Sequence, residues 1–214
     1  MINMDLNTWL RDFYPKILSD FGFSKEADER SAKILYELSK DKLLDCSVLR
    51  DKIANKRVAV IGGAVDIADV KFISELNDWV IMTSGKSVIK LKRLLPDLIP
   101  DVHVTDIEEP DDLLIDLEKN GCILVLHAHG DNIHRVKAVV PKLRGFIGTT
   151  QSIPFDRVYN FTGFTDGDRA AIIAKRFGAK EIKLYGFDFC KADDEVKLKK
   201  LKWAEKILKF EGII

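Results

Sequence analysis

Short apolar segments alternate with helix-like segments along most of the chain, and this alternation restricts the folds that it can form. The apolar segments have the length of strands, and glycine, small polar or acidic residues follow them. The intervening segments space their apolar residues three or four positions apart, as amphipathic helices do. The pattern predicts an α/β fold with a mostly parallel, Rossmann-like sheet of about six strands and helices on both faces. The clearest predicted strands are 57–61, 79–83, 102–105, 122–127 and 181–185.

The start of the chain differs because its pattern is helical throughout. Aromatic or aliphatic residues recur at every fourth position from Trp9 to Phe21, which gives one apolar face. Ser24 is the expected N-cap of the helix that follows. The predicted division is a helical cap, residues 1–54, and an α/β domain that ends in a C-terminal helix, residues 55–214.

Composition argues against several classes of function. The 214 residues include 34 basic and 34 acidic ones, so no overall positive charge favours nucleic acid. No apolar run approaches the length of a membrane helix, and we expect no secretory signal in the polar, charged start. The three cysteines are far apart and form no CxxC pair, which is typical of a reducing compartment. We therefore expect a soluble cytoplasmic protein, as a monomer or a homo-oligomer, without nucleic acid or membrane.

Segment 124–132 concentrates imidazoles at the end of a predicted strand. Three of the chain's four histidines, His127, His129 and His134, lie within eight positions. Parallel strands end at one edge of their sheet, where open α/β sheets bind ligands. Because side chains alternate along a strand, His127 and His129 should share a face. A polar loop without function is the alternative interpretation.

The same edge should collect the polar residues that follow the other strands, and this convergence predicts a site more strongly than any one motif. Glycines after the first strand allow close approach to a phosphate, or simply form a tight turn. The residues expected at this edge are Gly62, Gly63, Ser84, Gly85, Asp106, Thr149, Thr150, Gln151, Asp166, Asp168, Arg169 and Asp188.

The acidic residues at this edge predict a bound cation. Carboxylates that share a cleft are unfavourable unless a cation neutralises part of their charge. Oxygen ligands favour Mg²⁺, which needs only one or two carboxylates besides waters and phosphates. Asp106 directly follows a strand and is the first predicted ligand, with turn capping as the alternative. Glu108 and Asp131 are further candidates, with solvent exposure and helix capping as their alternatives.

The histidines and Arg169 suit phosphate groups. The spacing of His127 and His129 also occurs in transition-metal sites, but no third nitrogen or sulfur ligand follows nearby. We favour imidazoles, neutral or protonated, that face phosphate oxygens. Arg169 lies at a predicted helix start, which suits an anion, and pairing with Asp166 or Asp168 is the alternative. No nucleophile elbow, Ser–His–Asp order or Cys–His pair indicates acyl transfer.

Three segments, 127–132 (HAHGDN), 163–169 (GFTDGDR) and 185–189 (YGFDF), resemble the archaeal 6-hydroxymethyl-7,8-dihydropterin pyrophosphokinase family. The resemblance extends from about Ile53 onward, and the helical start also fits. The wider family includes bacterial proteins associated with flagellin glycosylation. The resemblance implies a fold like that of thiamin pyrophosphokinase. It also implies Mg²⁺-dependent transfer of diphosphate from ATP to the pterin's hydroxymethyl group, with release of AMP, in tetrahydromethanopterin or folate-type coenzyme biosynthesis.

The sequence departs from the family pattern at two places. Members often carry Asp-Leu-Asp-Gly after the third strand, whereas this chain has Asp-Ile-Glu-Glu at residues 106–109. The first acid is kept, so Asp106 remains usable as a Mg²⁺ ligand. Relatives in the wider family tend to have Gly-x-Gly-Pro-Ser where this chain has Gly-Gly-Ala-Val-Asp at residues 62–66.

The pyrophosphokinase hypothesis assigns a role to each candidate residue, while a nucleotide-sugar-dependent, glycosyltransferase-like enzyme and a non-catalytic nucleotide-binding protein remain the alternatives. A carboxylate suits the guanidine-like edge of a pterin, and an aromatic ring suits its face. The expected catalytic residues are His127, His129 and Arg169. The expected ATP-binding residues are Gly62, Gly63, Ser84, Gly85, Thr149, Thr150 and Gln151. The expected pterin-binding residues are Asp166, Asp188 and Phe164.

Overall fold

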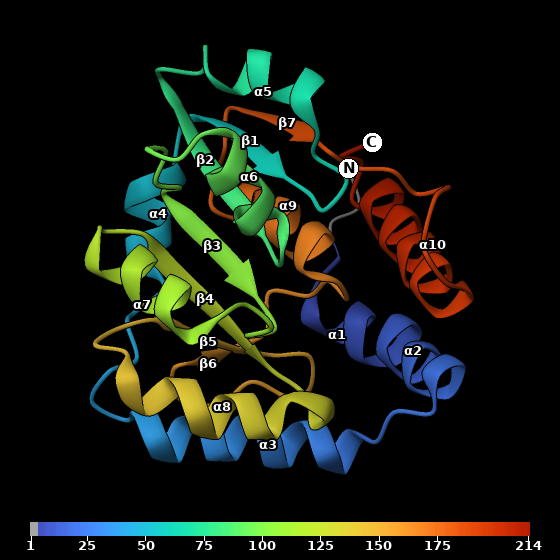
Figure 1. Ribbon diagram of the computed structural model, residues 1–214. Helices are drawn as coiled ribbons and strands as arrows, with labels where there is room; N and C mark the ends of the chain where they lie inside the picture. The colour runs from blue at the N-terminus through green and yellow to red at the C-terminus, as the bar shows by residue number, and fades with distance from the viewer. Residues whose placement is uncertain (1–3) are drawn as a thin grey trace.

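The computed structural model describes residues 4–214, and a sheet of seven parallel strands runs through this part of the chain (Figure 1). The sheet confirms the predicted α/β fold. The five clearest predicted strands are present, with ends shifted by at most one residue. The strands are β1 (Arg57–Ile61), β2 (Trp79–Ser84), β3 (Val102–Thr105), β4 (Ile123–Ala128), β5 (Ile147–Thr150), β6 (Val158–Tyr159) and β7 (Glu181–Tyr185).

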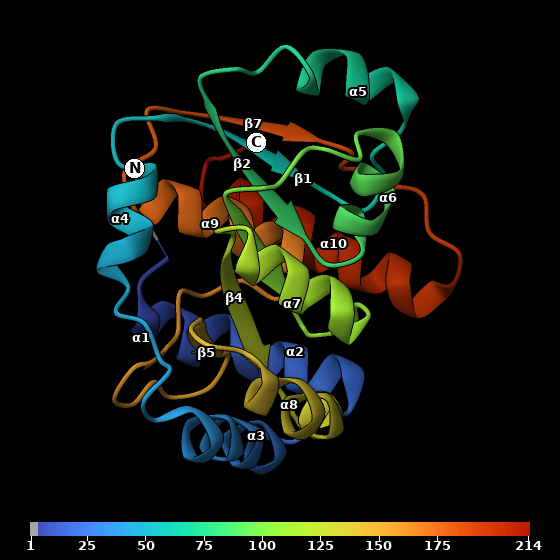
Figure 2. The same ribbon diagram turned by 60° about the vertical axis from the view of Figure 1, so that its left-hand side comes forward.

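The order of the strands determines which helices cover each face of the sheet. The order is β6-β5-β4-β3-β2-β1-β7, so the chain moves in one direction from β1 to β6 and then returns to the far side of β1. Because parallel crossovers are right-handed, α5 to α8 cover one face and α9 covers the other (Figure 2). The elements after β1 are α5 (Ile67–Ile73), α6 (Ser87–Leu94), α7 (Asp111–Lys119), η2 (Gly130–Asn132), α8 (Ile133–Val139), η3 (Val140–Lys142), α9 (Asp166–Arg176) and α10 (Glu195–Phe210).

The segment before β1 consists mostly of helices, as predicted. A π-helical turn precedes α2, and Pro15, which has no N–H to donate, lies directly after this turn. Gly22 ends α2 with a φ of 67°, and the Ser24 hydroxyl caps α3 by accepting from the Ala27 N–H at 3.2 Å. The elements are α1 (Leu6–Thr8), η1 (Trp9–Phe13), α2 (Tyr14–Phe21), α3 (Lys25–Ser39) and α4 (Ser47–Ile53).

These N-terminal helices contribute to the same hydrophobic clusters as the sheet. Helix α3 lies beside α8 (Figure 1), and its Leu35 belongs to one cluster with Leu126 and Phe146. Helix α4 lies on the opposite face, where Leu49 and Ile53 pack with residues of β1 and α9. Helix α2 packs with α9 and α10. The N-terminal region is therefore anchored on both faces of the sheet.

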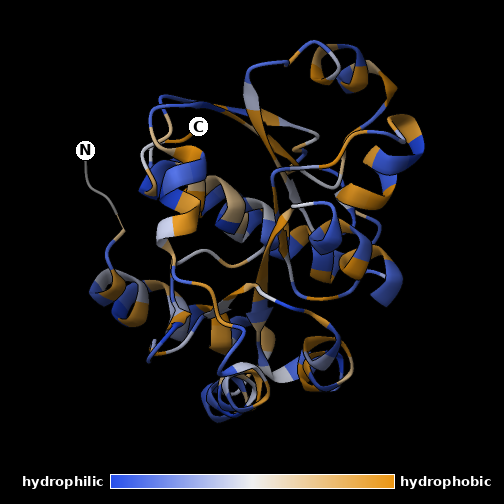
Figure 3. Cartoon of the chain, turned by 90° about the vertical axis from the view of Figure 1, so that its left-hand side faces the viewer, coloured by the Kyte–Doolittle hydropathy of each residue, from blue (hydrophilic) through white to orange (hydrophobic). Residues whose placement is uncertain are grey.

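Both faces of the sheet are buried, and the burial follows the strand pleat. On β4, Leu124 and Leu126 belong to the cluster under α7 and α8, whereas Val125 belongs to the cluster under α9. Figure 3 shows hydrophobic strands between helices that carry hydrophilic residues on their outer sides. This two-sided burial explains why the strands are almost continuously apolar in the sequence. Within residues 4–214, no helix has both the length and the apolar character needed to cross a membrane.

Two features of the elements differ from the sequence prediction. Helix α9 begins at Asp166 instead of near Ala170, because Thr165 is its N-cap and Asp168 completes a capping box. The sheet has seven strands where about six were expected, and its edge strand β6 is a two-residue pairing with β5. The earlier start of α9 moves its first turn to the edge where the strands end.

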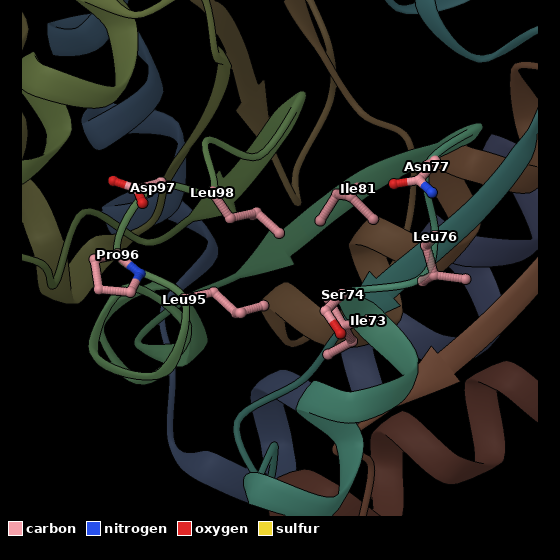
Figure 4. A pocket seen from close by; sticks show the side chains of 9 residues that line it. All are labelled: Ile73, Ser74, Leu76, Asn77, Ile81, Leu95, Pro96, Asp97 and Leu98. Carbon is pink, nitrogen blue, oxygen red and sulfur yellow. The ribbon is translucent and has the colours of Figure 1, made fainter.

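A pocket of about 300 Å³ lies at the amino ends of β2 and β3 (Figure 4). Aliphatic side chains provide most of its wall. This edge of the sheet is opposite the carboxyl ends of the strands, to which the predicted site residues belong. The pocket is therefore separate from the candidate site. Its lining residues are Ile73, Ser74, Leu76, Asn77, Ile81, Leu95, Pro96, Asp97 and Leu98.

The loops after β1 and β7 touch, and this contact yields a test of the fold. Gly186 has a φ of 66°, and a Cβ atom there would lie 2.2 Å from the backbone nitrogen of Val65. Gly178 also has a positive φ, 81°, but open space surrounds its Cβ position. We expect Gly178→Ala to lower the free energy of unfolding by ~1–2 kcal/mol, through backbone strain alone. Gly186→Ala should lower the free energy of unfolding by about 2–3 kcal/mol more than Gly178→Ala does, because the neighbouring backbone must shift. Equal losses in urea unfolding would contradict this close approach.

Candidate active site

Side chains from three parts of the chain meet at the carboxyl edge of the sheet. Asp106 follows β3, His127 and His129 lie at the end of β4, and Asp166 and Arg169 lie in the first turn of α9. His129 Nε2 lies 3.5 Å from Asp106 Oδ2. The Nη1 atom of Arg169 lies 3.3 Å from one carboxylate oxygen of each aspartate. We call these five residues the Arg169 cluster.

The local sequence buries Arg169 and directs its charge into the cluster. Its side chain is 2% exposed, and Nη2 donates to the carbonyl oxygen of Phe164 at 3.1 Å. Gly163 has a φ of 89°, and a Cβ atom there would lie 2.8 Å from the Arg169 Cα, so only glycine fits. Asp168 accepts from the N–H groups of Phe164 and Thr165 at 2.7 Å each. Asp168 is therefore a cap, and the buried guanidinium pairs with the two cluster aspartates.

The two aspartates of the cluster have opposite pKa shifts. Burial and the negative charge of Asp106 raise the pKa of Asp166 well above its usual value. Burial also opposes the ionisation of Asp106, but the positive charges of His129 and Arg169 outweigh it and hold its pKa below the usual range. The arrangement thus favours one negative charge on the pair, and a bound cation would allow both to ionise.

One buried amide connects three backbone groups of the cluster. Asn132 Nδ2 donates to the carbonyl oxygens of Asp106 at 2.8 Å and His127 at 2.7 Å. Its Oδ1 accepts from the His129 N–H at 3.0 Å. Asn132 thereby fixes the end of β4 relative to the loop after β3. Asn132 lies inside the HAHGDN segment, and the sequence made it a candidate ligand or a cap of the following helix.

The loop after β3 is held in a strained conformation. Ile107 has a φ of 66°, which is unfavourable for a β-branched residue. Its N–H donates to Thr105 Oγ1 at 2.7 Å, and its carbonyl oxygen accepts from Arg135 Nε at 2.7 Å. Arg135 also donates to the Glu109 carbonyl oxygen at 2.8 Å. These bonds keep Asp106 in one position, because the loop cannot relax without breaking them.

The N-terminal helices support the cluster through Asp28, which the sequence analysis missed. Asp28 is 2% exposed and accepts from the Gly130 N–H at 2.8 Å. Its other oxygen accepts from Gln151 Nε2 and the Tyr14 hydroxyl, at 2.7 Å each. The sequence does contain a signal for this role of Asp28. Helical spacing puts Asp28 on the same face of α3 as Leu35, which is buried. An acid on an apolar helix face needs buried partners.

Comparisons with known proteins cover the whole of this site. A family model described as 6-hydroxymethylpterin diphosphokinase MptE-like matches residues 29–194, more than three quarters of the chain. The chain belongs to this family. It is 34% identical to the 6-hydroxymethyl-7,8-dihydropterin pyrophosphokinase of Methanocaldococcus jannaschii, over 97% of this chain and 95% of that protein. It is 36% identical to the protein of that name from Methanothermobacter thermautotrophicus, over 87% and 79%, and 32% identical to that from Pyrococcus furiosus, over 94% and 91%.

In this member of the pterin diphosphokinase family, His127 is the more buried of the two histidines of the cluster. It is 1% exposed, and its Nδ1 lies 3.1 Å from Thr149 Oγ1. Its Nε2 is buried and has no hydrogen-bond partner among residues 4–214. Burial and the positive charge of Arg169 lower the pKa of His127 well below its usual value. Of the two states considered from the sequence, the site therefore favours the neutral imidazole.

The other predicted ATP-binding residues lie around the strand ends. A Cβ atom on Gly85 would lie 2.7 Å from Asp166 Oδ2, so this glycine allows the carboxylate to approach β2. The Ser84 hydroxyl donates to the Ile61 carbonyl oxygen at 2.9 Å, and Thr150 Oγ1 accepts from the Ser152 N–H at 3.2 Å. Gly62 and Gly63 follow β1, and Gly62 lies against the loop after β7. Gln151 is buried and bonds to Asp28 of α3.

The side chains of four predicted residues lie apart from the Arg169 cluster. Glu108 is 59% exposed and pairs with Lys86 on the surface, at 2.8 Å. Asp131 is exposed in η2, and Asp188 is exposed and accepts from the N–H groups of the turn after β7. Phe164 is 7% exposed and packs in the core, 5.1 Å from the Phe21 ring. The cluster thus has Asp166 where the sequence suggested Glu108 or Asp131 as the partner of Asp106.

Substitution of Asn132 tests whether its amide holds the cluster together. Asn132→Asp keeps the shape of the side chain. It places a carboxylate oxygen against the carbonyl oxygens of Asp106 and His127, which accept hydrogen bonds from Asn132 in the unaltered protein. We expect the free energy of unfolding in urea to fall by about 2–4 kcal/mol, because buried carbonyl groups lose their donors. Asn77→Asp is the control, since Asn77 is exposed. Similar stability of both variants would show that Asn132 contributes no net stabilisation.

The buried, neutral His127 predicts a pH dependence of stability. The unfolded chain has the ordinary histidine pKa of about 6.5, whereas folding lowers the pKa of His127, so protons favour unfolding. The contribution of His127 to the free energy of unfolding is complete above about pH 6.5 and decreases as the pH falls below that value. Urea unfolding between about pH 5 and 8 should show a smaller decrease for His127→Gln than for the unaltered chain. His134→Gln, at an exposed histidine, is the control and should keep the decrease.

Proposed function

We propose that this protein transfers the diphosphate group of ATP to the hydroxymethyl group of 6-hydroxymethyl-7,8-dihydropterin in the cytoplasm, with Mg²⁺. The products are AMP and the pterin diphosphate, a precursor of tetrahydromethanopterin or a folate-type coenzyme. The observation that carries the proposal is the buried Arg169 between two carboxylates at the strand ends. Membership of the pterin diphosphokinase family and the names of the three relatives support the choice of substrate.

Arg169 and the start of α9 suit the phosphates of ATP. Free N–H groups and the helix dipole attract anions to a helix N-terminus, and the buried guanidinium adds a fixed positive charge beside it. His129 lies next to Asp106 and is partly exposed, so it reaches a ligand at the same edge. Transfer of phosphoryl groups depends mainly on positioning and charge stabilisation, which these fixed groups provide.

The donor atoms of the cluster fit Mg²⁺. Asp106 and Asp166 place carboxylate oxygens on the same guanidinium, and both remain partly exposed, at 24% and 18%. Across the described chain, no set of three or more histidine, cysteine or acidic side chains is arranged to hold a metal. Mg²⁺ usually requires only one or two carboxylates and completes its shell with waters and phosphates. When bound, Mg²⁺ would neutralise phosphate charge. We therefore propose Asp106 and Asp166 as its protein ligands.

The carboxyl end of the paired strands β1 and β7 is our proposed place for a planar ring. Strand order reverses there, and ligands of open α/β sheets bind at such reversals. The Phe187 ring approaches to 2.9 Å from the Cβ position of Gly62 and 3.1 Å from that of Gly167. The two glycines thus make room for an aromatic side chain that can stack on a ligand. Phe187 suits this role better than the buried Phe164.

Product analysis tests the proposed reaction. The purified protein is incubated with ATP, Mg²⁺ and 6-hydroxymethyl-7,8-dihydropterin, and nucleotides and pterins are separated by chromatography. We expect AMP and pterin diphosphate in equal amounts, and neither product after addition of a chelator. Formation of ADP would instead indicate transfer of a single phosphoryl group. Nucleotide binding without turnover would support a non-catalytic binder, and turnover of a sugar nucleotide would support the glycosyltransferase alternative.

Paired acidic variants test the proposed ligand set. Asp106→Asn should lower kcat/KM by ~10²-fold or more, because it removes a carboxylate ligand of the Mg²⁺ that would neutralise phosphate charge. Glu108→Gln should stay within about threefold of the unaltered protein, since an exposed ion pair contributes little. Both rates are measured by AMP release at saturating Mg²⁺. A large loss of kcat/KM in Glu108→Gln together with a small loss in Asp106→Asn would indicate that the metal binds outside the Arg169 cluster.

A further inference from the structure

The hydrogen-bond partners of Thr149 determine which nitrogen of His127 carries its proton. Thr149 Oγ1 lies 3.0 Å from the Leu126 carbonyl oxygen and 3.1 Å from His127 Nδ1. A carbonyl oxygen only accepts, so the one hydroxyl hydrogen of Thr149 goes to Leu126. The hydroxyl then has only lone pairs to offer to His127, and Nδ1 must donate. A neutral imidazole with a proton on Nδ1 has none on Nε2.

We propose that Thr149 holds His127 as the Nδ1–H tautomer, and that His127 Nε2 accepts the proton of the substrate's hydroxymethyl group. The second part rests on the proposed function, whereas the tautomer does not. Nε2 is buried and lacks a hydrogen-bond partner within the described chain, and an unpaired buried acceptor is unfavourable unless a ligand completes it. Thr149 is a positioning residue in this arrangement, and His127 is the catalytic residue.

The groups around His127 support an acceptor at Nε2. Arg169 from α9 is a fixed positive charge nearby, and it favours the neutral imidazole over the imidazolium. Asp106 after β3 and the His129 ring, 6.1 Å away, are the other ionisable neighbours. His129 differs because its Nε2 faces Asp106 and its Nδ1 accepts from the Asp131 N–H. His127 is therefore the cluster histidine whose free nitrogen remains for the substrate.

The proposed step is balanced in atoms and charge. The hydroxymethyl O–H bond breaks as its hydrogen moves to His127 Nε2, and the oxygen forms a bond to the β-phosphorus of ATP. The bond from that phosphorus to the oxygen bridging the α-phosphate breaks, and its electron pair leaves with AMP. The imidazolium then releases the proton to water and returns to the neutral ring. General bases of this kind contribute ~10²–10⁴-fold to the rate.

Nitrogen NMR tests the tautomer without any substrate. In protein labelled with ¹⁵N-histidine, the His127 signals are identified by their loss in His127→Gln. We expect Nδ1 to have the shift and the one-bond hydrogen coupling of a protonated nitrogen, and Nε2 to have those of an unprotonated one, near neutral pH. Thr149→Ser should preserve this pattern, whereas Thr149→Val should not. A proton on Nε2 in the unaltered protein, or no change in Thr149→Val, would overturn the tautomer assignment.

Kinetics with ATP and 6-hydroxymethyl-7,8-dihydropterin test the proton acceptor. His127→Gln should lower kcat by ~10²-fold or more, with little change in the KM for ATP. Thr149→Val should lower kcat by at least ~10-fold, and Thr149→Ser should restore most of the loss. Circular dichroism and thermal unfolding establish that each variant is folded. Full kcat in His127→Gln, or equal losses in both Thr149 variants, would overturn the acceptor role. If the unaltered protein forms no AMP while the tautomer is as expected, the proposed function and the acceptor role fail but the tautomer stands.

Discussion

The rest of the site depends on one buried charge, the guanidinium of Arg169. A cation that is 2% exposed loses its hydration and must be compensated by opposite charge and by hydrogen bonds. Asp106 and Asp166 supply the charge, and the Phe164 carbonyl oxygen supplies a further bond. The loop after β3 and the first turn of α9 must therefore lie within ion-pair distance of each other. The close approach at Gly163 and the capping box of α9 are the local means by which the chain achieves this.

Fixed partners keep the loops of the site from relaxing. Backbone N–H and C=O groups in buried loops need hydrogen bonds, and here side chains from other elements provide them. Asn132 bonds to both strand ends, Asp28 reaches in from α3, and Arg135 holds the loop after β3. Such support holds the side chains of the Arg169 cluster in one geometry. The N-terminal helices are thus part of the site's support, in addition to their packing against the sheet.

Sequence patterns predicted the sheet well but the arrangement of side chains only in part. Strand positions followed from apolar runs, and the convergence of strand ends followed from the handedness of crossovers. The partner of Asp106 did not follow in the same way. Glu108 is two residues away but points to surface Lys86, because the positive φ of Ile107 turns the chain between them. Asp166, sixty residues later, meets the same guanidinium as Asp106.

The sequence by itself determined the parallel α/β sheet, the edge at which polar residues gather, and the motifs that resemble the pterin diphosphokinase family. These properties depend on local periodicity, turn chemistry and short segments, which are written directly in the chain. Only the tertiary structure decided which carboxylates share Arg169. It also decided that burial lowers the pKa of His127 and leaves its Nε2 without a partner among the described residues. Charge state and ion pairing depend on burial and on contacts between segments far apart in sequence, so local patterns do not specify them.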